Sequence, residues 1–422
     1  MKLQKLVAAL ALVILILSMG LPLSYSTHKV RVIVTVDKRS FERASISRLG
    51  GVVVKEYEII PAVLVELPEH AVKELKKLSG VIRVEHDGVV RALGVGIRGR
   101  PQPPQVTPWG IKRIGAPDAW LTTNGFADLD GDGDSEIEVA ILDTGVDYDH
   151  PDLYANVKWG ICVVLDKVST RPRDWDDRNG HGTHVAGIVA ALYNDIGVVG
   201  AAHGVELYAI KVLSDSGFGY WSDVIEGIEW ALKGPDGVID SDDDGVIVGD
   251  PDDDAAEVIS MSLGASSAPE AVHDAISVAY GYNVTLVAAA GNDGAESPSY
   301  PAAYEEVIAV GATDENDEVP SWSNRNPELT APGVDILSTY KAGGYETLSG
   351  TSMACPHVSA TVALVQAARL ANDLPPMPPD ELKQLLTRTA DDCGDPGYDA
   401  LYGYGIVRAD KAVEEALDSS SG

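Results

Sequence analysis

Val139-Ala140-Ile141-Leu142-Asp143-Thr144-Gly145 is an apolar run that ends in a carboxylate and a small turn. Apolar runs of this length are typical of strands that are buried on both faces of a parallel sheet. From Trp109 onward, similar runs alternate with helical patterns: we expect strands at 138–142, 205–212, 258–263, 285–290 and 307–311, and helices at 182–192, 220–232 and 269–280. This alternation predicts an α/β domain with a doubly wound, mainly parallel sheet.

The segment before this domain has a different pattern. Residues 29–87 contain short strands and two helical stretches in the order β-α-β-β-α-β, which predicts a small α+β domain of the ferredoxin-like type. A run rich in Pro and Gly, 94–108, marks the boundary. Its glycines at 94, 96 and 99 match the dinucleotide-binding fingerprint, but Arg100-Pro101 follows and cannot open a helix, so we interpret this run as a linker.

The first 26 residues are typical of a secretion signal. Lys2 and Lys5 are followed by apolar residues from Leu6 to Leu17, and small residues stand near residue 26, where signal peptidase would cut. A retained membrane anchor is the alternative, but a spanning helix needs about 20 apolar residues. The sequence therefore predicts a secreted protein that has no membrane attachment after the signal is removed.

Charge is unevenly distributed along the 422 residues, whose formal net charge is -32. Residues 27–93 hold 12 Lys and Arg against 9 Asp and Glu, whereas residues 94–422 hold 18 against 55. So acidic a body argues against nucleic-acid binding and suits high salt, solubility or bound divalent cations.

The hydroxyl of Ser352 stands where a further helix is predicted to begin. In Gly350-Thr351-Ser352-Met353-Ala354-Cys355-Pro356-His357, we place Pro356 in the first helical turn, where a missing amide costs little. The free amides of such a helix start, together with the positive end of its dipole, favour negative charge beside Ser352. A lone serine in this position would more often be a helix cap.

A third motif, Asn179-Gly180-His181-Gly182-Thr183-His184, puts His181 at the mouth of a helix of small residues. His181 and His184 could bind zinc, but the sequence lacks the Glu of the His-Glu-x-x-His pattern. Asp143-Thr144-Gly145 also resembles an aspartic protease loop, and Asp215-Ser216-Gly217 could be its partner. That pairing would leave His181 and Ser352 unexplained.

Taken in order, Asp143, His181 and Ser352 with their motifs resemble the catalytic residues of the subtilisin-like serine proteases, or subtilases. The resemblance covers most of the chain from Gln105 onward. It implies a serine endopeptidase in which His181 takes the Ser352 proton and Asp143 orients the imidazole. Asn292, which follows the strand at 285–290, would be the oxyanion donor beside the Ser352 amide.

The resemblance also implies a substrate cleft that binds an extended peptide by strand addition. One wall of the P1 pocket would be Ser262, Leu263 and Gly264, the other wall would be Ala289, Ala290 and Gly291, and a flexible edge would be Gly217, Phe218 and Gly219. Small residues around this pocket predict a broad preference for large apolar P1 residues.

Calcium is the cofactor that we expect, at several sites. The resemblance implies one site formed by Gln105, Asp152, the carbonyls of Leu192, Ile196 and Val198, and the side chain of Asn194. Two acidic loops have carboxylates at alternate positions with glycines between them, as calcium loops do: Asp128, Asp130, Asp132 and Asp134 in one, and Asp240, Asp242, Asp244, Asp250, Asp252 and Asp253 in the other. Solvated acidic loops without metal are the alternative.

Residues 27–93 resemble the inhibitory propeptide of this family, which is removed by self-cleavage, and we expect the cut after Leu93. The predicted organisation is a signal peptide at 1–26, a propeptide at 27–93, a linker at 94–106, a catalytic domain at 107–418 and a tail at 419–422. The expected partners are polypeptide substrates and the chain's own propeptide, and the enzyme is expected to be a monomer. A catalytically silent, calcium-dependent binding module is the rival interpretation.

Overall fold

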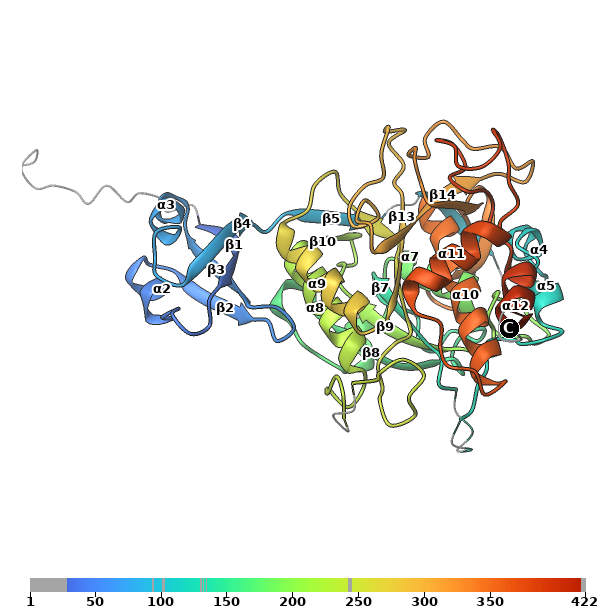
Figure 1. The fold of residues 1–422 in the computed structure, drawn as a ribbon, viewed down its shortest axis with the longest axis horizontal. Coiled ribbons are helices and arrows are strands. Elements are labelled where there is room, and N and C mark those ends of the chain that lie inside the picture. The colour runs from blue at the N-terminus through green and yellow to red at the C-terminus, as the bar shows by residue number, and fades with distance from the viewer. Residues whose placement is uncertain are drawn as a thin grey trace, which may run out of the picture.

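The computed structural model describes residues 29–92, 95–100, 103–129, 131, 133, 135–241 and 245–418, with only the backbone described for 95–100. Figure 1 shows a small N-terminal domain that lies against one side of a larger body. No helix in these described residues is both long enough and apolar enough to cross a membrane.

The small domain is a four-stranded antiparallel sheet in the order β2-β3-β1-β4. Its strands are β1 (Lys29–Val36), β2 (Val52–Glu56), β3 (Ala62–Pro68) and β4 (Val81–His86), and its helices are α2 (Ala44–Arg48), the 3-10 turn η1 (Glu69–Ala71) and α3 (Val72–Leu75).

Both faces of this small sheet are apolar. Val32 and Val34 of β1 point toward the domain's own helices and share a cluster with Ile46 and Leu75. The intervening residue, Ile33, points the other way and packs in a cluster with Trp221 of the larger body. Because side chains alternate along a strand, one face of the small sheet is covered by its own helices and the other by the larger body.

The larger body is built on a seven-stranded sheet in the order β15-β14-β13-β11-β7-β9-β8, and all of its neighbouring strands run parallel. Its strands are β7 (Glu138–Asp143), β8 (Val157–Cys162), β9 (Glu206–Lys211), β11 (Val258–Met261), β13 (Thr285–Ala289), β14 (Val307–Thr313) and β15 (Leu329–Pro332). The predicted fold class is confirmed.

Helices cover both faces of this sheet. On one face, α7 (His181–Ala190) and α10 (Thr351–Leu370) pack together in a single core cluster with α12 (Ala409–Asp418). On the other face lie α8 (Trp221–Lys233) and α9 (Glu270–Gly281), which also receive the small domain. The remaining helical segments are α4 (Trp109–Arg113), α5 (Ala116–Ala119), η2 (Val164–Asp166), α6 (Pro172–Trp175) and α11 (Pro379–Thr389).

Two small sheets join segments that are distant in sequence. β5 (Val89–Ala92) lies between β10 (Phe218–Tyr220) and β12 (Leu263–Gly264). β6 (Val95–Arg100) pairs with β17 (Gly344–Ser349), which also pairs with β16 (Ile336–Tyr340). The segment that we predicted as a linker therefore contains a strand.

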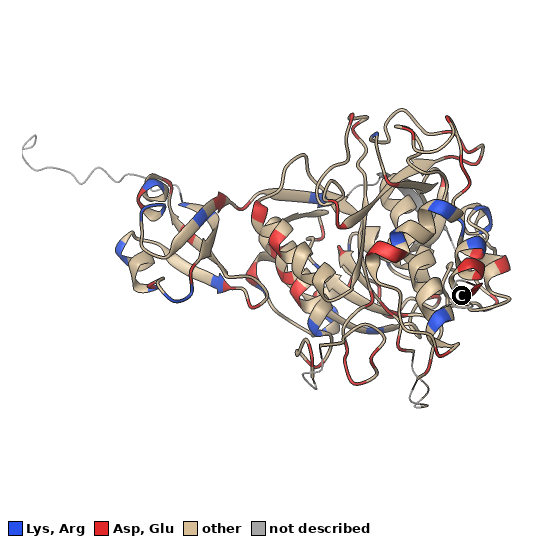
Figure 2. Cartoon of the chain, in the orientation of Figure 1, with Lys and Arg blue, Asp and Glu red and all other residues tan. Residues whose placement is uncertain are grey.

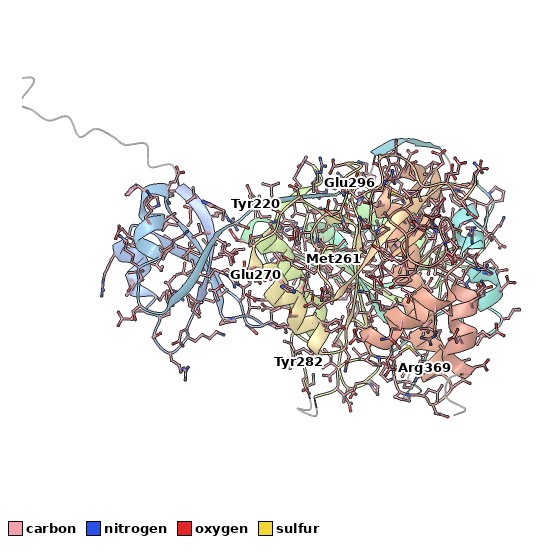
Figure 3. The ribbon with its side chains drawn as sticks, turned by 45° about the horizontal axis from the view of Figure 1, so that its top comes forward. Tyr220, Met261, Glu270, Tyr282, Glu296 and Arg369 are labelled. Carbon is pink, nitrogen blue, oxygen red and sulfur yellow. The ribbon has the colours of Figure 1, made fainter. Side chains whose placement is uncertain are left out.

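Carboxylates of the small domain reach the starts of the two helices beneath it. Asp87 accepts hydrogen bonds from the Ser222 amide (3.0 Å) and hydroxyl (2.8 Å), and Glu85 accepts one from the Glu270 amide (2.8 Å). Figure 3 labels Tyr220 and Glu270 at this junction, and Figure 2 shows acidic residues along α8 and α9 facing the small domain. Negative charge at a helix start is favourable, so the two domains meet through complementary polar groups as well as apolar ones.

Candidate active site

The predicted catalytic side chains come from three different elements of the larger body. Asp143 is the last residue of β7, His181 is the first residue of α7, and Ser352 is the second residue of α10. Parallel strands place their carboxyl ends at one edge of the sheet, and ligands bind beyond that edge.

Asp143 and His181 are buried and directly bonded. His181 Nδ1 lies 2.7 Å from Asp143 Oδ1 and 2.9 Å from Oδ2. Burial opposes protonation of the imidazole, but the charge and the hydrogen bond of Asp143 outweigh it, so the pKa of His181 lies above its ordinary value. His181 Nε2 has no hydrogen-bond partner among the described residues. One ring nitrogen is thus fixed, while the other is available to a reacting group.

Ser352 is held by a reciprocal pair of hydrogen bonds with Ser262. The Ser352 hydroxyl donates to the Ser262 carbonyl (3.1 Å), and the Ser262 hydroxyl donates to the Ser352 carbonyl (2.8 Å). The second bond has a cause in the sequence. α10 begins at Thr351, so Pro356 lies in the second turn, and our placement of it in the first turn is wrong. A proline there cannot donate to the residue four positions back, which leaves the Ser352 carbonyl for Ser262.

Asn292 lies beside the nucleophile and is oriented by Thr351. Asn292 Oδ1 accepts hydrogen bonds from the Thr351 amide and hydroxyl, both at 2.9 Å. Because the amide oxygen is engaged in this way, Asn292 Nδ2 is the end of the side chain that can donate to a substrate.

Asp177 organises the site, and sequence reasoning missed it. This buried carboxylate accepts hydrogen bonds from Thr144 next to Asp143, from the Gly180 amide before His181, and from the Thr183 amide and hydroxyl. Burial raises its pKa, although these hydrogen bonds act in the opposite direction. Asp177 thus ties the loop that carries the aspartate to the helix that carries the histidine. Its position four residues before His181 is no recognisable signal for that role.

Some of the residues that we predicted to bind substrate lie beside β5, and the others lie near Ser352 and Asn292. Gly217 accepts a hydrogen bond from the Ala92 amide (3.0 Å), Phe218 pairs with Arg91, and Leu263 pairs with Ala92. Ser262 contacts Ser352, as described above. Ala289 ends β13, and Ala290 and Gly291 lead from it to Asn292, with the Gly291 amide bonded to Thr351. The predicted cut site, Leu93, lies outside the described residues.

Comparison with known proteins identifies the family of this chain. Residues 134–405 match the profile of the family described as the Subtilase family. The chain belongs to the subtilase family. A thermostable alkaline protease of Halalkalibacterium halodurans is 35% identical over 402 residues, which cover 94% of this chain and 96% of that protein.

Two other relatives give the same result. An alkaline protease of Shouchella clausii is 38% identical over 85% of this chain and 80% of its own length. Subtilisin E of Bacillus subtilis is 36% identical over 87% of this chain and 85% of its own length. The protein is therefore a subtilase serine endopeptidase that acts on polypeptides, and its similarity to these relatives includes the N-terminal domain.

The subtilase brings the predicted ligands of the first calcium site together. Four oxygens surround Gln105 Nε2: Leu192 O at 2.7 Å, Asn194 Oδ1 at 3.3 Å, Ile196 O at 3.4 Å and Val198 O at 3.2 Å. An amide nitrogen carries two hydrogens, so it cannot satisfy four acceptors. Carbonyl and amide oxygens are ligands that Ca²⁺ takes, so this donor set fits the ion.

Asp152 lies against the same loop. Its Oδ1 accepts a hydrogen bond from Asn194 Nδ2 (2.7 Å), and its Oδ2 accepts from the Val198 amide (2.9 Å) and the Tyr345 hydroxyl (3.2 Å). Burial raises the pKa of this carboxyl, while the three hydrogen bonds lower it. Asp152 would supply negative charge to a cation held by the loop.

The two acidic loops are only partly described. Asp130, Asp132, Asp134, Asp242 and Asp244 lie outside the described residues, and no group of three His, Cys, Asp or Glu side chains within the described part is arranged to hold a metal. Asp128, Asp240 and Asp250 accept hydrogen bonds from amides of their own loops, as does Asp253 Oδ1 from Ser241. Asp253 is buried, and its Oδ2 has no hydrogen-bond partner in the described residues. Calcium at these loops stays a prediction.

The alternative chemistries do not fit this geometry. Asp143 is engaged with His181, whereas Asp215 is half-exposed and paired with Lys211 at 3.0 Å, so the two aspartates do not share a proton. His184 Nε2 contacts the carbonyl oxygens of Ile336 and Glu346 and does not bind a ligand together with His181.

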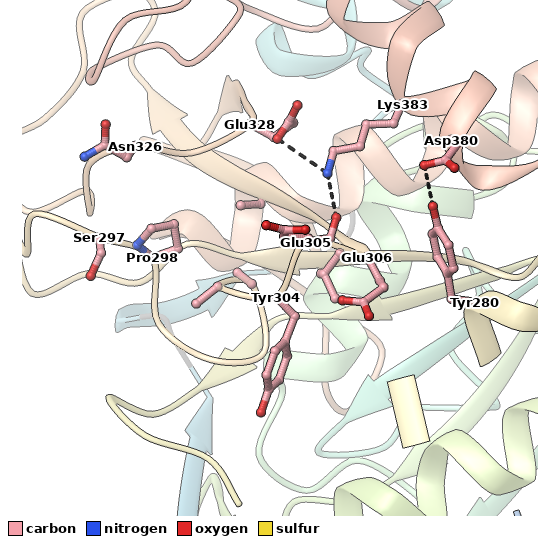
Figure 4. A pocket seen from close by; sticks show the side chains of 14 residues that line it. Tyr280, Ser297, Pro298, Tyr304, Glu305, Glu306, Asn326, Glu328, Asp380 and Lys383 are labelled. Atoms are coloured by element: carbon pink, nitrogen blue, oxygen red, sulfur yellow. Dashed lines mark hydrogen bonds and ion pairs between the residues drawn. The ribbon is translucent and has the colours of Figure 1, made fainter. Parts of the chain in front are cut away.

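A polar cavity of about 690 Å³ lies elsewhere on the molecule, between α9, α11 and the loop before β14. In Figure 4, Lys383 donates to the Glu305 carbonyl and pairs with Glu328, and the Tyr280 hydroxyl bonds Asp380. No histidine is among the described residues that line this cavity, so its Ser297 has no imidazole beside it to act as a base.

Proposed function

We propose that this subtilase is a secreted, calcium-stabilised endopeptidase made as a self-processing precursor. The observation that carries the proposal is the course of β5, which lies between β10 and β12 in the manner of a bound peptide. Its last residue, Ala92, pairs with Leu263, the neighbour of the Ser262 that bonds Ser352. The domain division follows our sequence prediction, with the signal at 1–26, the inhibitory propeptide at 27–93 and the catalytic domain at 107–418.

In the proposed reaction, the Ser352 hydroxyl exchanges the Ser262 carbonyl for His181 Nε2 as its acceptor and attacks the scissile carbonyl carbon. His181 takes the hydroxyl proton and then gives it to the leaving amine, while Asp143 stabilises the imidazolium. Asn292 Nδ2 and the Ser352 amide donate to the oxyanion. Water, activated by His181, then hydrolyses the acyl-enzyme and restores Ser352.

We infer a broad preference for large apolar P1 residues. Gly264 carries no side chain and lines the cavity beside β5, which leaves room for a large group at this wall of the cleft. Leu93, the residue at which we expect the chain to cut itself, is such a group.

Calcium would be held by the loop that surrounds Gln105 and, in addition, by the acidic loops. At the first site the ion would link residues 192–198 to Gln105 and Asp152, fixing the segment that follows the linker. At the second acidic loop, Asp253 Oδ2 is buried and has no hydrogen-bond partner among the described residues, which supports a bound cation because such an oxygen is costly to bury alone.

The test of self-processing is Ser352→Ala. This variant should accumulate as the uncleaved precursor, and its activity should fall about 10⁶-fold, the magnitude known for subtilisin. The intact mass of the purified chain reports the outcome. Normal maturation of Ser352→Ala in the absence of other proteases would overturn self-processing and leave the family membership intact.

A further inference from the structure

β5 indicates how the cleft would bind an extended peptide and which of its side chains would contact the enzyme. Val90 and Arg91 are neighbours on this strand, and they point to opposite sides: Val90 is fully buried, whereas Arg91 is exposed. Arg91 pairs with Phe218 on one side and with Gly264 on the other. A substrate that enters the same two-sided pairing would place its own third residue before the scissile bond where Arg91 lies, if the cut follows Leu93 as proposed above.

The exposed Arg91 meets a carboxylate on the rim of the cleft. Its Nη2 lies 3.0 Å from Asp293 Oδ1 and 3.3 Å from Oδ2, and both residues line a cavity of about 220 Å³. The Asp293 backbone is fixed, since its amide donates to Asn324 Oδ1 (3.1 Å) and Asn324 Nδ2 donates to the Ala290 carbonyl (2.9 Å). The residue that carries this carboxylate therefore has a defined place, directly after Asn292.

We propose that Asp293 is a specificity-determining residue that favours substrates with a basic side chain at the position of Arg91, the P3 position. Substrate pairing with β10 and β12 would bring a P3 side chain to the same carboxylate. A single nitrogen of Arg91 makes both contacts, so the site does not require the fork of a guanidinium and should accept lysine as well.

The expected preference is modest, because both partners are largely exposed: the side chains of Arg91 and Asp293 keep 52% and 60% of their accessible surface. Ion pairs of this kind change binding about two- to fivefold, and salt screens them. A P3 preference of this size should therefore shrink at high ionic strength, whereas a preference based on shape would not.

The experiment measures kcat/KM of the mature enzyme on peptides that contain Val-Val-X-Ala-Leu-Gly-Val, after residues 89–95, with X as Arg, Lys, Gln or Glu. Arg and Lys should exceed Gln about two- to fivefold, and Glu should be poorest. Asp293→Asn should bring the Arg to Gln ratio close to one. Asp293→Lys should invert it in favour of Glu.

Glu296→Gln is the matched control. Glu296, which Figure 3 labels, lies three residues further along the same loop and is exposed. No hydrogen bond or ion pair joins its carboxylate to the described residues of β5. Glu296→Gln removes the same charge from the same loop and should leave the ratio of kcat/KM for the Arg and Gln peptides unchanged. An equal fall in both variants, or an Arg to Gln ratio of one in the unmodified enzyme, would refute the role of Asp293.

Mass spectrometry of the products separates this proposal from the one on which it rests. If the peptides are cut after a residue other than Leu, the cleavage site proposed for the precursor is wrong, and Arg should then be moved along the peptide to find its preferred position. If they are cut after Leu without any effect of X, the cleavage site stands and the P3 preference falls.

Discussion

The small domain and the larger body differ in how they complete their cores. The larger body covers both faces of its sheet with its own helices, α7 and α10 on one side and α8 and α9 on the other. The small domain covers one face of its sheet and leaves Ile33 and Leu64 on the other face to pack against α8 and α9. The larger body thus completes its own core, whereas the small domain depends on the body that it covers.

Of the predictions that test this comparison, the largest effect is expected in the larger body. Asp143→Asn should lower kcat about 10⁴-fold, because the imidazole loses the partner that sets its tautomer. It should also move the acid limb of the pH profile. In the unmodified enzyme, activity needs neutral His181, whose raised pKa places that limb above the range of an ordinary histidine. Without the charge of Asp143, burial dominates and the limb should shift to lower pH.

Steady-state kcat/KM between pH 5 and pH 10 would measure both effects. Asp176→Asn serves as the control, since it removes a negative charge from the loop before His181 without bonding to the ring. An unchanged acid limb in Asp143→Asn would show that Asp143 does not control the histidine.

A second prediction tests the small domain and its dependence on the larger body. Ile33→Ala removes packing against α8, so the inhibition constant of added 27–93 segment for the mature enzyme should rise about tenfold to a hundredfold, equal to about 1.4–2.7 kcal/mol. Val34→Ala, one residue along on the opposite face, should mainly lower the thermal stability of the segment itself, as circular dichroism would record. If the two variants weaken inhibition equally and destabilise the segment equally, the two-faced description of this sheet fails.

A third prediction concerns calcium. Removal of the ion by a chelator should lower the stability of the mature enzyme by about 2.7 kcal/mol relative to a solution with calcium at 100 times its dissociation constant. The chelator should therefore lower the melting temperature of the enzyme. Asn194→Ala should make this decrease smaller, because Asn194 Oδ1 is one of the four oxygens around Gln105 Nε2. Asn316→Ala, in an exposed loop distant in sequence, should leave the decrease in melting temperature caused by the chelator unchanged. A melting temperature that is indifferent to the chelator would remove calcium from the proposal.

The candidate catalytic residues and the fold class could be predicted largely from the sequence. Asp143, His181 and Ser352 stand in short motifs, and each motif contains the strand end or helix start that positions its side chain. The alternation of apolar runs and helical patterns was sufficient to predict the parallel sheet, because hydrophobic periodicity is a local property. The placement of Pro356 was wrong because the helix starts at Thr351, five residues before it, and a sequence locates a helix start only to within one or two residues.

Sequence by itself thus determined the chemistry that this protein carries, the sheet that supports it and the acidic character of the enzyme. Only the tertiary structure decided what lies together across long separations: Asp177 between the two catalytic loops, β6 on β17, the second face of the small sheet on α8, and Arg91 on Asp293. The physical reason is that these contacts depend on strand register and on how the two domains meet. Register and docking are set by the sum of packing over many residues, whereas a motif records only its immediate neighbours.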